Sequence, residues 1–128
     1  MAYGDNQSLG IPGLLAGAAL TTKQYYFVKL ASTAGEVVTC NATTDVAIGV
    51  LQNNPADGEP AEVRALGVTK VVCSSTAVTA GSLIGWNAEG QAENRTQTGS
   101  RFAGVALAAS STDGDITSIL LTGVSRGA

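Results

Sequence analysis

Short apolar segments separated by turn residues run along most of the chain, in the pattern typical of β-strands. Residues 24–30, Gln-Tyr-Tyr-Phe-Val-Lys-Leu, are rich in aromatic and β-branched residues, and Ala34-Gly35 then marks a turn. The same pattern predicts further strands at residues 36–40, 47–52, 61–66, 68–73, 83–86, 91–93, 102–108 and 116–121. Short strands at this spacing predict an all-β fold, a small β-barrel or β-sandwich. Gly67 interrupts an otherwise continuous run and predicts a bulge or a sharp bend.

The first 19 residues lack this pattern. They show no sustained period of 2 or 3.6 and mix glycine, proline and asparagine with a small apolar cluster of Ile11, Leu14 and Leu15. We therefore expect two parts, an extended N-terminal arm at residues 1–19 and a β-barrel domain at residues 20–128. A short helix across residues 14–20 is the alternative for the arm.

The chain also resembles itself, which predicts an internal duplication. Residues 34–42 align with residues 80–88, and residues 48–50 align with residues 103–105. Further downstream the Asp57-Gly58 and Asp113-Gly114 dipeptides correspond, as do Gly67 and Gly123 after one spacing adjustment. In this alignment residues 89–99 are a hairpin-like insert of the second unit. A chance likeness of two glycine- and valine-rich stretches is the alternative.

Charge and composition exclude several classes of partner. Seven basic residues against ten acidic ones give a net charge of −3, which offers no basic surface for a nucleic-acid backbone. The early apolar stretch from Ile11 to Leu20 is interrupted by Pro12 and Gly13 and is too short to span a membrane. The start of the sequence, Met1 to Asp5, lacks the basic region of a signal peptide, so synthesis in the cytoplasm is expected. Cys40 and Cys73 are then predicted to be free and buried.

The residues needed for catalysis are missing from the sequence. There is no histidine, no Gly-x-Ser-x-Gly motif and no phosphate-binding loop, so we predict a protein that is not an enzyme and has no cofactor. Two groups of carboxylates lie at Asp-Gly dipeptides. The first group is Asp57, Glu59 and Glu62, and the second is Asp113 and Asp115. Asp-Gly is typical of a tight turn, so turn formation explains both groups without a catalytic or metal-binding role. We expect no metal site, with calcium at Asp113 and Asp115 as the weaker alternative.

Trp86 and one of two adjacent tyrosines are candidates for contact with a partner. Trp86 is the single tryptophan and is expected in the core or at an interface. Tyr25 and Tyr26 would point to opposite faces of a strand, so one of them is expected at the surface.

Three segments resemble the phage capsid cement, or head decoration, proteins: residues 20–30, residues 48–55 with the sequence Ile-Gly-Val-Leu-Gln-Asn-Asn-Pro, and residues 58–63. The likeness continues through Gly67-Val68-Thr69-Lys70-Val71 and residues 104–107 to residues 119–121, and it covers about residues 9–122. The Gly-Val-Leu-Gln-Asn-x-Pro stretch is the most specific part.

The resemblance implies a structural virion protein on the exterior of a phage capsid. Its partners would be the major capsid protein and further copies of the chain, with a homotrimer favoured. We expect the apolar arm to lie across capsid subunits, because ordering an arm costs entropy that only an assembled surface offsets. The candidate contact residues are Ile11, Pro12, Leu14, Leu15, Tyr25 and Trp86. The alternatives are a module that binds host surfaces or glycans, and a structural component of the tail or of head completion.

Overall fold

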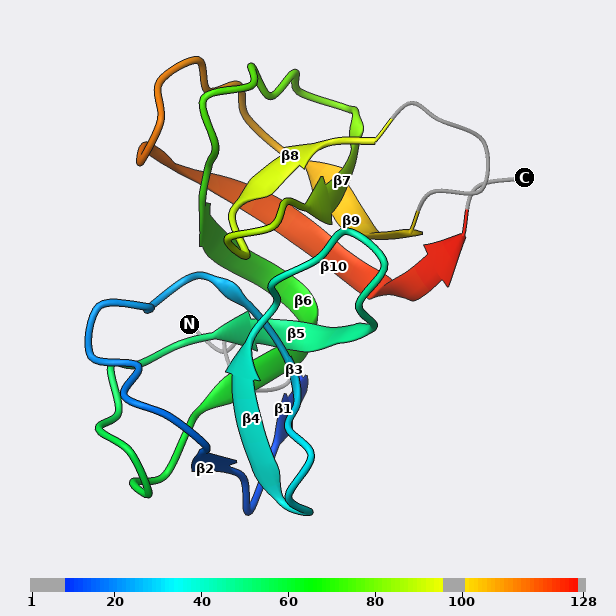
Figure 1. Cartoon of the computed structure of the whole chain (residues 1–128). Helices are drawn as coiled ribbons and strands as arrows, with labels where there is room; N and C mark the ends of the chain where they lie inside the picture. Colours follow the sequence, from blue (N-terminus) through cyan, green and yellow to red (C-terminus); the bar gives the residue numbers. More distant parts are fainter. Residues whose placement is uncertain (1–8, 96–100, 127–128) are drawn as a thin grey trace, which may run out of the picture.

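The computed structural model describes residues 9–95 and 101–126, which form ten β-strands and no helix (Figure 1). The strands are β1 (Leu9–Ile11), β2 (Leu15–Ala16), β3 (Phe27–Leu30), β4 (Glu36–Thr39), β5 (Ala47–Leu51), β6 (Val63–Val72), β7 (Leu83–Trp86), β8 (Ala92–Asn94), β9 (Arg101–Ala106) and β10 (Ile116–Arg126). The prediction of an all-β fold of short strands is confirmed. No described helix could cross a membrane.

The strand order shows that the chain consists of two equivalent units. Neighbouring strands follow the order β2-β4-β3-β5-β6-β10-β9-β7-β8, with β1 paired to β6 off this path. Read from the β6–β10 pair outwards, β5-β3-β4 on one side corresponds to β9-β7-β8 on the other. Strands β3–β6 therefore form a first unit and β7–β10 a second, joined through β6 and β10. Figure 1 shows the first unit below and the second above.

The pairing registers agree with this equivalence residue by residue. Val28 pairs with Gly49 in the first unit as Ile84 pairs with Gly104 in the second. The offset is 56 positions from Val28 to Ile84 and 55 positions from Gly49 to Gly104. Residues with positive φ recur at the same places: Tyr25 and Gly81, Gly35 and Gly90, Gly58 and Gly114, and Gly67 and Gly123.

The duplication predicted from the sequence is thus present in the strand order, but part of its alignment was wrong. The correspondences of residues 48–50 with 103–105 and of the two Asp-Gly dipeptides agree with the structure. Residues 34–42 do not correspond to residues 80–88, because Gly35 precedes β4 whereas Gly81 precedes β7, the counterpart of β3. The supposed insert contains β8, the counterpart of β4, and residues 96–99 of it lie outside the described residues.

Two long strands, β6 and β10, carry the bends that fold the sheet over its core. Each bends at a glycine with positive φ, Gly67 (φ 100°) and Gly123 (φ 92°). The bend predicted at Gly67 is confirmed, within one continuous strand rather than between two. The sheet is not closed into a barrel, since its path ends at β2 on one side and β8 on the other. The barrel expectation is corrected to an open, folded sheet.

Two groups of buried side chains make up the core. The larger group combines both units, with Phe27, Cys40 and Val50 from the first and Ile84, Trp86 and Ile119 among those from the second. The smaller group belongs to the first unit and the segment before it: Leu14, Ala16, Leu20, Val28, Val37, Leu51, Ala61 and Val63. Burying a leucine or valine side chain of this group stabilises the fold by about 1.5–3 kcal/mol.

The described part of the N-terminal arm is extended, as expected, but it is not separate from the sheet. Strand β1 pairs antiparallel with β6, and β2 pairs parallel with β4. Leu14, Ala16 and Leu20 are buried in the smaller core. Sequence periodicity could not show this, because strands of two or three residues are too short to establish a period. Residues 1–8 of the arm lie outside the described residues.

Candidate functional site

A groove lies beside the N-terminal segment, between its turn and the start of β6. Strand β1 runs along β6, and the chain then reverses at Pro12 and Gly13, whose φ of 80° a glycine adopts without strain. The main-chain N–H of Ala61 donates to the carbonyl of Leu14 (2.9 Å), which fixes the far side of this turn. The resulting hollow has a volume of about 750 Å³ and opens to the surface.

The walls of the groove are mainly apolar. It is lined by Gly10, Ile11, Pro12, Gly13, Leu14, Leu15, Gln52, Pro60, Ala61, Glu62, Val63 and Arg64. The side chain of Gln52 is already used internally, since its amide donates to Thr69 Oγ1 (2.7 Å) and to the Val50 carbonyl (3.1 Å). Arg64 donates to the carbonyl of Val68 (2.7 Å). A groove of this kind suits an apolar segment of a partner better than a polar small molecule.

The structure brings four of the six predicted contact residues together at this groove. Pro12 and Leu15 are exposed, and Ile11 is half-buried. Leu14 contributes to the wall but its side chain is 8% exposed, so it chiefly supports the turn. The exposed members of the predicted set are therefore Pro12 and Leu15, with Ile11 partly exposed beside them.

The other two residues, Tyr25 and Trp86, lie elsewhere. Tyr25 is half-buried against the larger core, with a φ of 70°, and donates from its main-chain N–H to the Leu51 carbonyl. Trp86 is 0% exposed, and its ring centroid lies 5.5 Å from that of Phe27. The core interpretation of Trp86 is therefore confirmed, and its side chain offers no surface to a partner.

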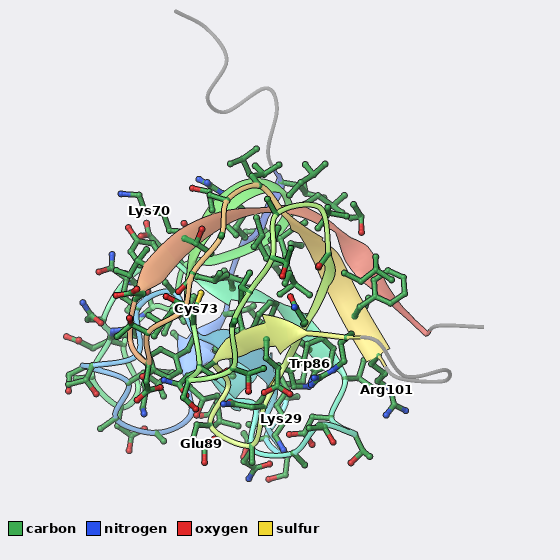
Figure 2. The ribbon with its side chains drawn as sticks, turned by 90° about the horizontal axis from the view of Figure 1, so that it is seen from above. Lys29, Lys70, Cys73, Trp86, Glu89 and Arg101 are labelled. Atoms are coloured by element: carbon green, nitrogen blue, oxygen red, sulfur yellow. The ribbon has the colours of Figure 1, made fainter. Side chains whose placement is uncertain are left out.

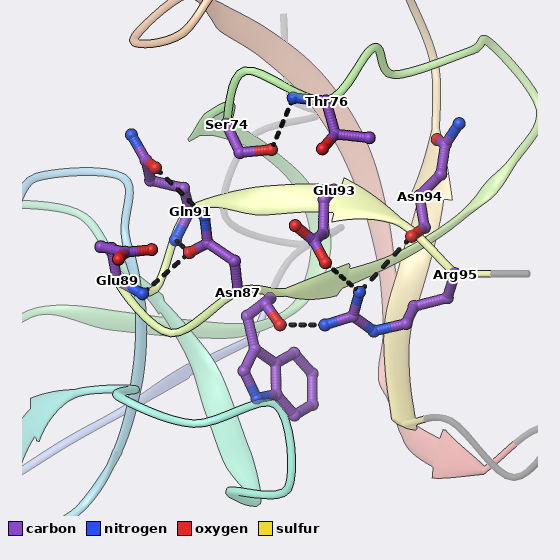
Figure 3. Close-up of polar contacts among 9 residues, drawn as sticks. Ser74, Thr76, Asn87, Glu89, Gln91, Glu93, Asn94 and Arg95 are labelled. Carbon is purple, nitrogen blue, oxygen red and sulfur yellow. Dashed lines mark hydrogen bonds and ion pairs between the residues drawn. The ribbon is translucent and has the colours of Figure 1, made fainter. Parts of the chain in front are cut away.

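Arg95 covers the outer side of the strand that carries Trp86 (Figure 3). Its guanidinium forms an ion pair with Glu93 and donates to the main-chain carbonyl of Trp86. Gly85 makes this possible, because a Cβ at that position would collide with the Arg95 side chain. The arrangement is an internal brace rather than a reactive site.

Other groups with chemical potential also have structural roles. Burial raises the pKa of the Cys40 thiol to about 12, so this thiol stays protonated and unreactive at neutral pH. Cys73 is likewise buried and free, as predicted, and burial raises its pKa. Among the described residues, no group of three or more His, Cys, Asp or Glu side chains could hold a metal ion, so the calcium alternative gains no support.

A second exposed apolar surface, which was not predicted from the sequence, lies on the outer face of β6, β10, β9 and β7. Val68 pairs with Leu120, Leu120 with Val105, and Val105 with Leu83, so these four side chains form one row across four strands. We call them the aliphatic row. The alternation along β6 and β10 is visible in the sequence, but the row depends on pairings between strands far apart in the chain.

Comparison with known proteins decides the family. The family model for phage cement proteins matches residues 16–122, which is most of the chain. The chain belongs to the phage cement protein family. This family is structural and non-enzymatic, in agreement with the prediction that the chain is not an enzyme. The cement protein is thus a structural protein of the phage head.

A solved structure shares the fold of this cement protein. It is the N base of the head fiber protein gp8.5 of bacteriophage phi29, with a TM-score of 0.67 and 13% sequence identity over 90% of this chain and 94% of that one. At this identity the likeness concerns the fold alone. No curated protein matches the chain.

Proposed function

We propose that this cement protein decorates the outer surface of a phage head, binds the major capsid protein and stabilises the assembled shell. The observation that carries the proposal is the match to the cement family over residues 16–122. The similarity in fold to a head fiber base supports the same location. The chain would act after its synthesis in the host cytoplasm, as part of the virion exterior.

The groove beside the N-terminal segment is the proposed contact with the capsid. Ile11, Pro12 and Leu15 present apolar surface on a segment that is tied to the sheet at β1 and β2. Because this segment is already ordered, binding through it costs less conformational entropy than ordering a free arm would. Covering one exposed leucine contributes roughly 1.5 kcal/mol or more, which is about a tenfold change in affinity.

We also propose that the protein acts as a homotrimer. Each subunit would present its own groove, so that a trimer contacts the shell at three places and gains avidity without new contacts. A low net charge of −3 permits close packing of copies, because the repulsion between them is small.

The alternative of a glycan-binding module is not favoured by the described aromatic residues. Such sites use exposed aromatic faces, whereas Trp86 is buried and Tyr25 and Tyr26 are half-buried. Lys23 also lies over the Tyr26 ring, with its Nζ 4.7 Å from the ring centroid, which further covers that face.

Co-sedimentation with capsids tests the proposal. The purified protein is mixed with expanded capsids that lack it, and with free capsid protein as a control. We expect saturable binding to capsids alone. Leu15→Asp should weaken binding by at least about tenfold, because a carboxylate would be buried against an apolar surface. Val46→Asp, at an exposed valine outside the groove, is the matched control and should bind like the parent protein.

Two results would count against the proposal. If the parent protein binds no capsid, decoration is wrong. If it binds but Leu15→Asp binds equally well, the groove is not the contact surface.

A further inference from the structure

Strand β1 takes the same place on β6 that the second half of β6 takes on β10. Arg64 of β6 is paired with β5 on one edge and, through Gly10, with β1 on the other. The bend glycines at positions 67 and 123 are 56 positions apart, which makes Leu120 of β10 the counterpart of Arg64. Leu120 is paired with β9 on one edge and, through Val68, with β6 on the other. Gly10 therefore lies where the equivalence of the two units would place a residue of another long strand.

The second half of β6 leaves its own unit to complete the other one. Beyond the bend, residues 67–72 of β6 pair antiparallel with residues 116–121 of β10. Residues 123–126 of β10, which we call the β10 end, are the counterpart of this second half of β6. Among the residues that the structure describes, the β10 end pairs only with Arg101 and Phe102 of β9, and no described strand pairs with its other edge. The β10 end is thus built like a connecting strand, with no further unit in the chain to connect to.

The β10 end is held away from the first half of its own β6. The two long strands diverge beyond their bend glycines, with the first half of β6 in the first unit and the β10 end alongside β9 (Figure 1). The start of β9 is tied in place, because the guanidinium of Arg101 donates to the main-chain carbonyl of Thr44. Figure 2 shows Arg101 at the side of the molecule where β9 begins and β10 ends. Another copy of the chain, rather than the same one, can therefore bring a β10 end to the edge that β1 covers.

Strand β1 is a weak cover for this edge of β6. It has three residues, and its register shifts between Leu9 and Gly10. Leu9 is 55% exposed, so its side chain gains little from burial. The segment that follows is held separately, by the burial of Leu14 and Ala16 in the smaller core. Strand β1 can therefore leave β6 by local opening while the rest of the N-terminal segment stays in place.

We propose that β1 is a removable cover and that, when it leaves, the edge of β6 beneath it binds the β10 end of a second copy by strand addition. The contact repeats between two chains the pairing that joins the two units within one chain. In this register Val124 of the second copy lies opposite Arg64, as Val68 lies opposite Leu120 within a chain. With β1 in place, copies do not join through this edge, since a covered edge offers no template for pairing. The proposal goes beyond decoration of the shell and does not depend on it.

Disulfide cross-linking between two variants of the chain tests the proposal. Chains with Arg64→Cys are mixed with chains with Val124→Cys under mild oxidation, so that only a contact between copies can join these two cysteines in a heterodimer. The native Cys40 and Cys73 are buried and do not compete. We expect the heterodimer to form slowly from the full-length chains. Deleting residues 2–11 from both chains should speed its formation by about tenfold or more, because only molecules with an open β1 can pair.

A matched pair of variants and a peptide serve as controls. Val46→Cys replaces Val124→Cys in the matched pair, since Val46 is exposed and lies outside β6 and β10, and this pair should cross-link only by random collision. An excess of a synthetic peptide of residues 9–14 should slow the cross-linking of the full-length chains, because the peptide competes for the edge of β6. This second measurement does not require the shortened chain to fold.

Two results would overturn the proposal. If the heterodimer of Arg64→Cys and Val124→Cys forms no faster than the matched pair, the β10 end does not bind the edge of β6. If it forms faster but neither the deletion nor the peptide changes its rate, β1 does not cover the binding edge. Cross-linking is measured without capsids, so either failure leaves the proposed decoration of the shell intact. A failure of co-sedimentation with capsids likewise leaves the pairing between copies intact.

Discussion

The two units have the same strand order but complete their cores differently. In the first unit the segment before β3 supplies Leu14, Ala16 and Leu20, which close a core of its own. In the second unit the core is the larger one, built around Trp86 and shared with Phe27 and Cys40 of the first unit. The first unit therefore depends on the N-terminal segment, and the second depends on the first. Equivalent strand order does not imply equivalent stability, because stability follows from what covers each sheet.

The difference extends to the turns before the equivalent strands β3 and β7. Gly81 and Tyr25 share a positive φ, of 86° and 70°. The second unit has the residue that adopts this conformation without strain, whereas the first has a tyrosine whose ring packs against the core. In the first unit, packing compensates for a conformation that an L-residue disfavours.

The largest expected effect comes from removing the N-terminal segment. Deletion of residues 2–18 removes β1, β2 and the buried side chains of Leu14 and Ala16. We expect the first unit to lose its cooperative fold, and Leu14→Ala alone to lower the free energy of unfolding by about 2–4 kcal/mol. Hydrogen exchange measures the protection of the main-chain amides in each unit separately, and we expect protection to be lost first in β3–β5. Leu9→Ala, at an exposed position, is the control. Unchanged protection in the deletion variant would show that the segment is dispensable, as a free arm would be.

The next effect tests whether the two units are equivalent in energy as well as in topology. A Cβ at Gly49 would collide with the Arg64 carbonyl, and one at Gly104 with the Leu120 carbonyl. We expect Gly49→Ala and Gly104→Ala each to cost about 2–3 kcal/mol of stability, measured by urea unfolding. Gly10→Ala is the control, since its added methyl group meets only the Val63 carbonyl at 3.4 Å. If Gly49→Ala and Gly104→Ala lower the stability by widely different amounts, the two units are equivalent in strand order but not in energy.

The shared core makes stability fall in alkaline solution. The folded pKa of Cys40 is raised from 9.0 to about 12, because burial disfavours the thiolate. Above the unfolded pKa the unfolded chain releases this proton and the folded chain keeps it, so the contribution is present below pH 9 and is lost between pH 9 and 12. We expect a loss of up to about 1.4 kcal/mol per pH unit. Urea unfolding across this range should show a shallower slope for Cys40→Ala. If stability falls equally steeply with pH in Cys40→Ala and in the parent protein, groups other than Cys40 cause the alkaline loss of stability.

The smallest effect concerns the turn before each unit. Gly81→Ala should cost about 1 kcal/mol, because φ is positive and the added methyl group meets no atom within 4 Å. Tyr25→Gly removes the same strain in the first unit but also loses the packing of its ring, so its net effect should be near zero. Thermal unfolding of both variants measures the two costs. A large loss for Tyr25→Gly would show that packing outweighs strain there.

Much of the fold could be read from the sequence, because strands and turns are local. The segments around 36–40, 47–52 and 83–86 became β4, β5 and β7 within one or two residues. The bend at Gly67 and the correspondence with Gly123 also depend on local backbone preference. The lack of histidine and of catalytic motifs is a property of composition, so the prediction of a non-enzymatic protein needed no knowledge of which residues meet in space.

Contacts between distant segments were decided only by the tertiary structure. Leu14 and Leu15 are adjacent in an unpatterned segment, yet one is buried in the core and the other is exposed at the groove. The aliphatic row joins Val68, Leu83, Val105 and Leu120 through three strand pairings, and a shift of one residue in any of them would have turned a strand's side chains to the other face. Local patterns determine which residues can be in a strand, whereas long-range pairing determines which surfaces those strands build.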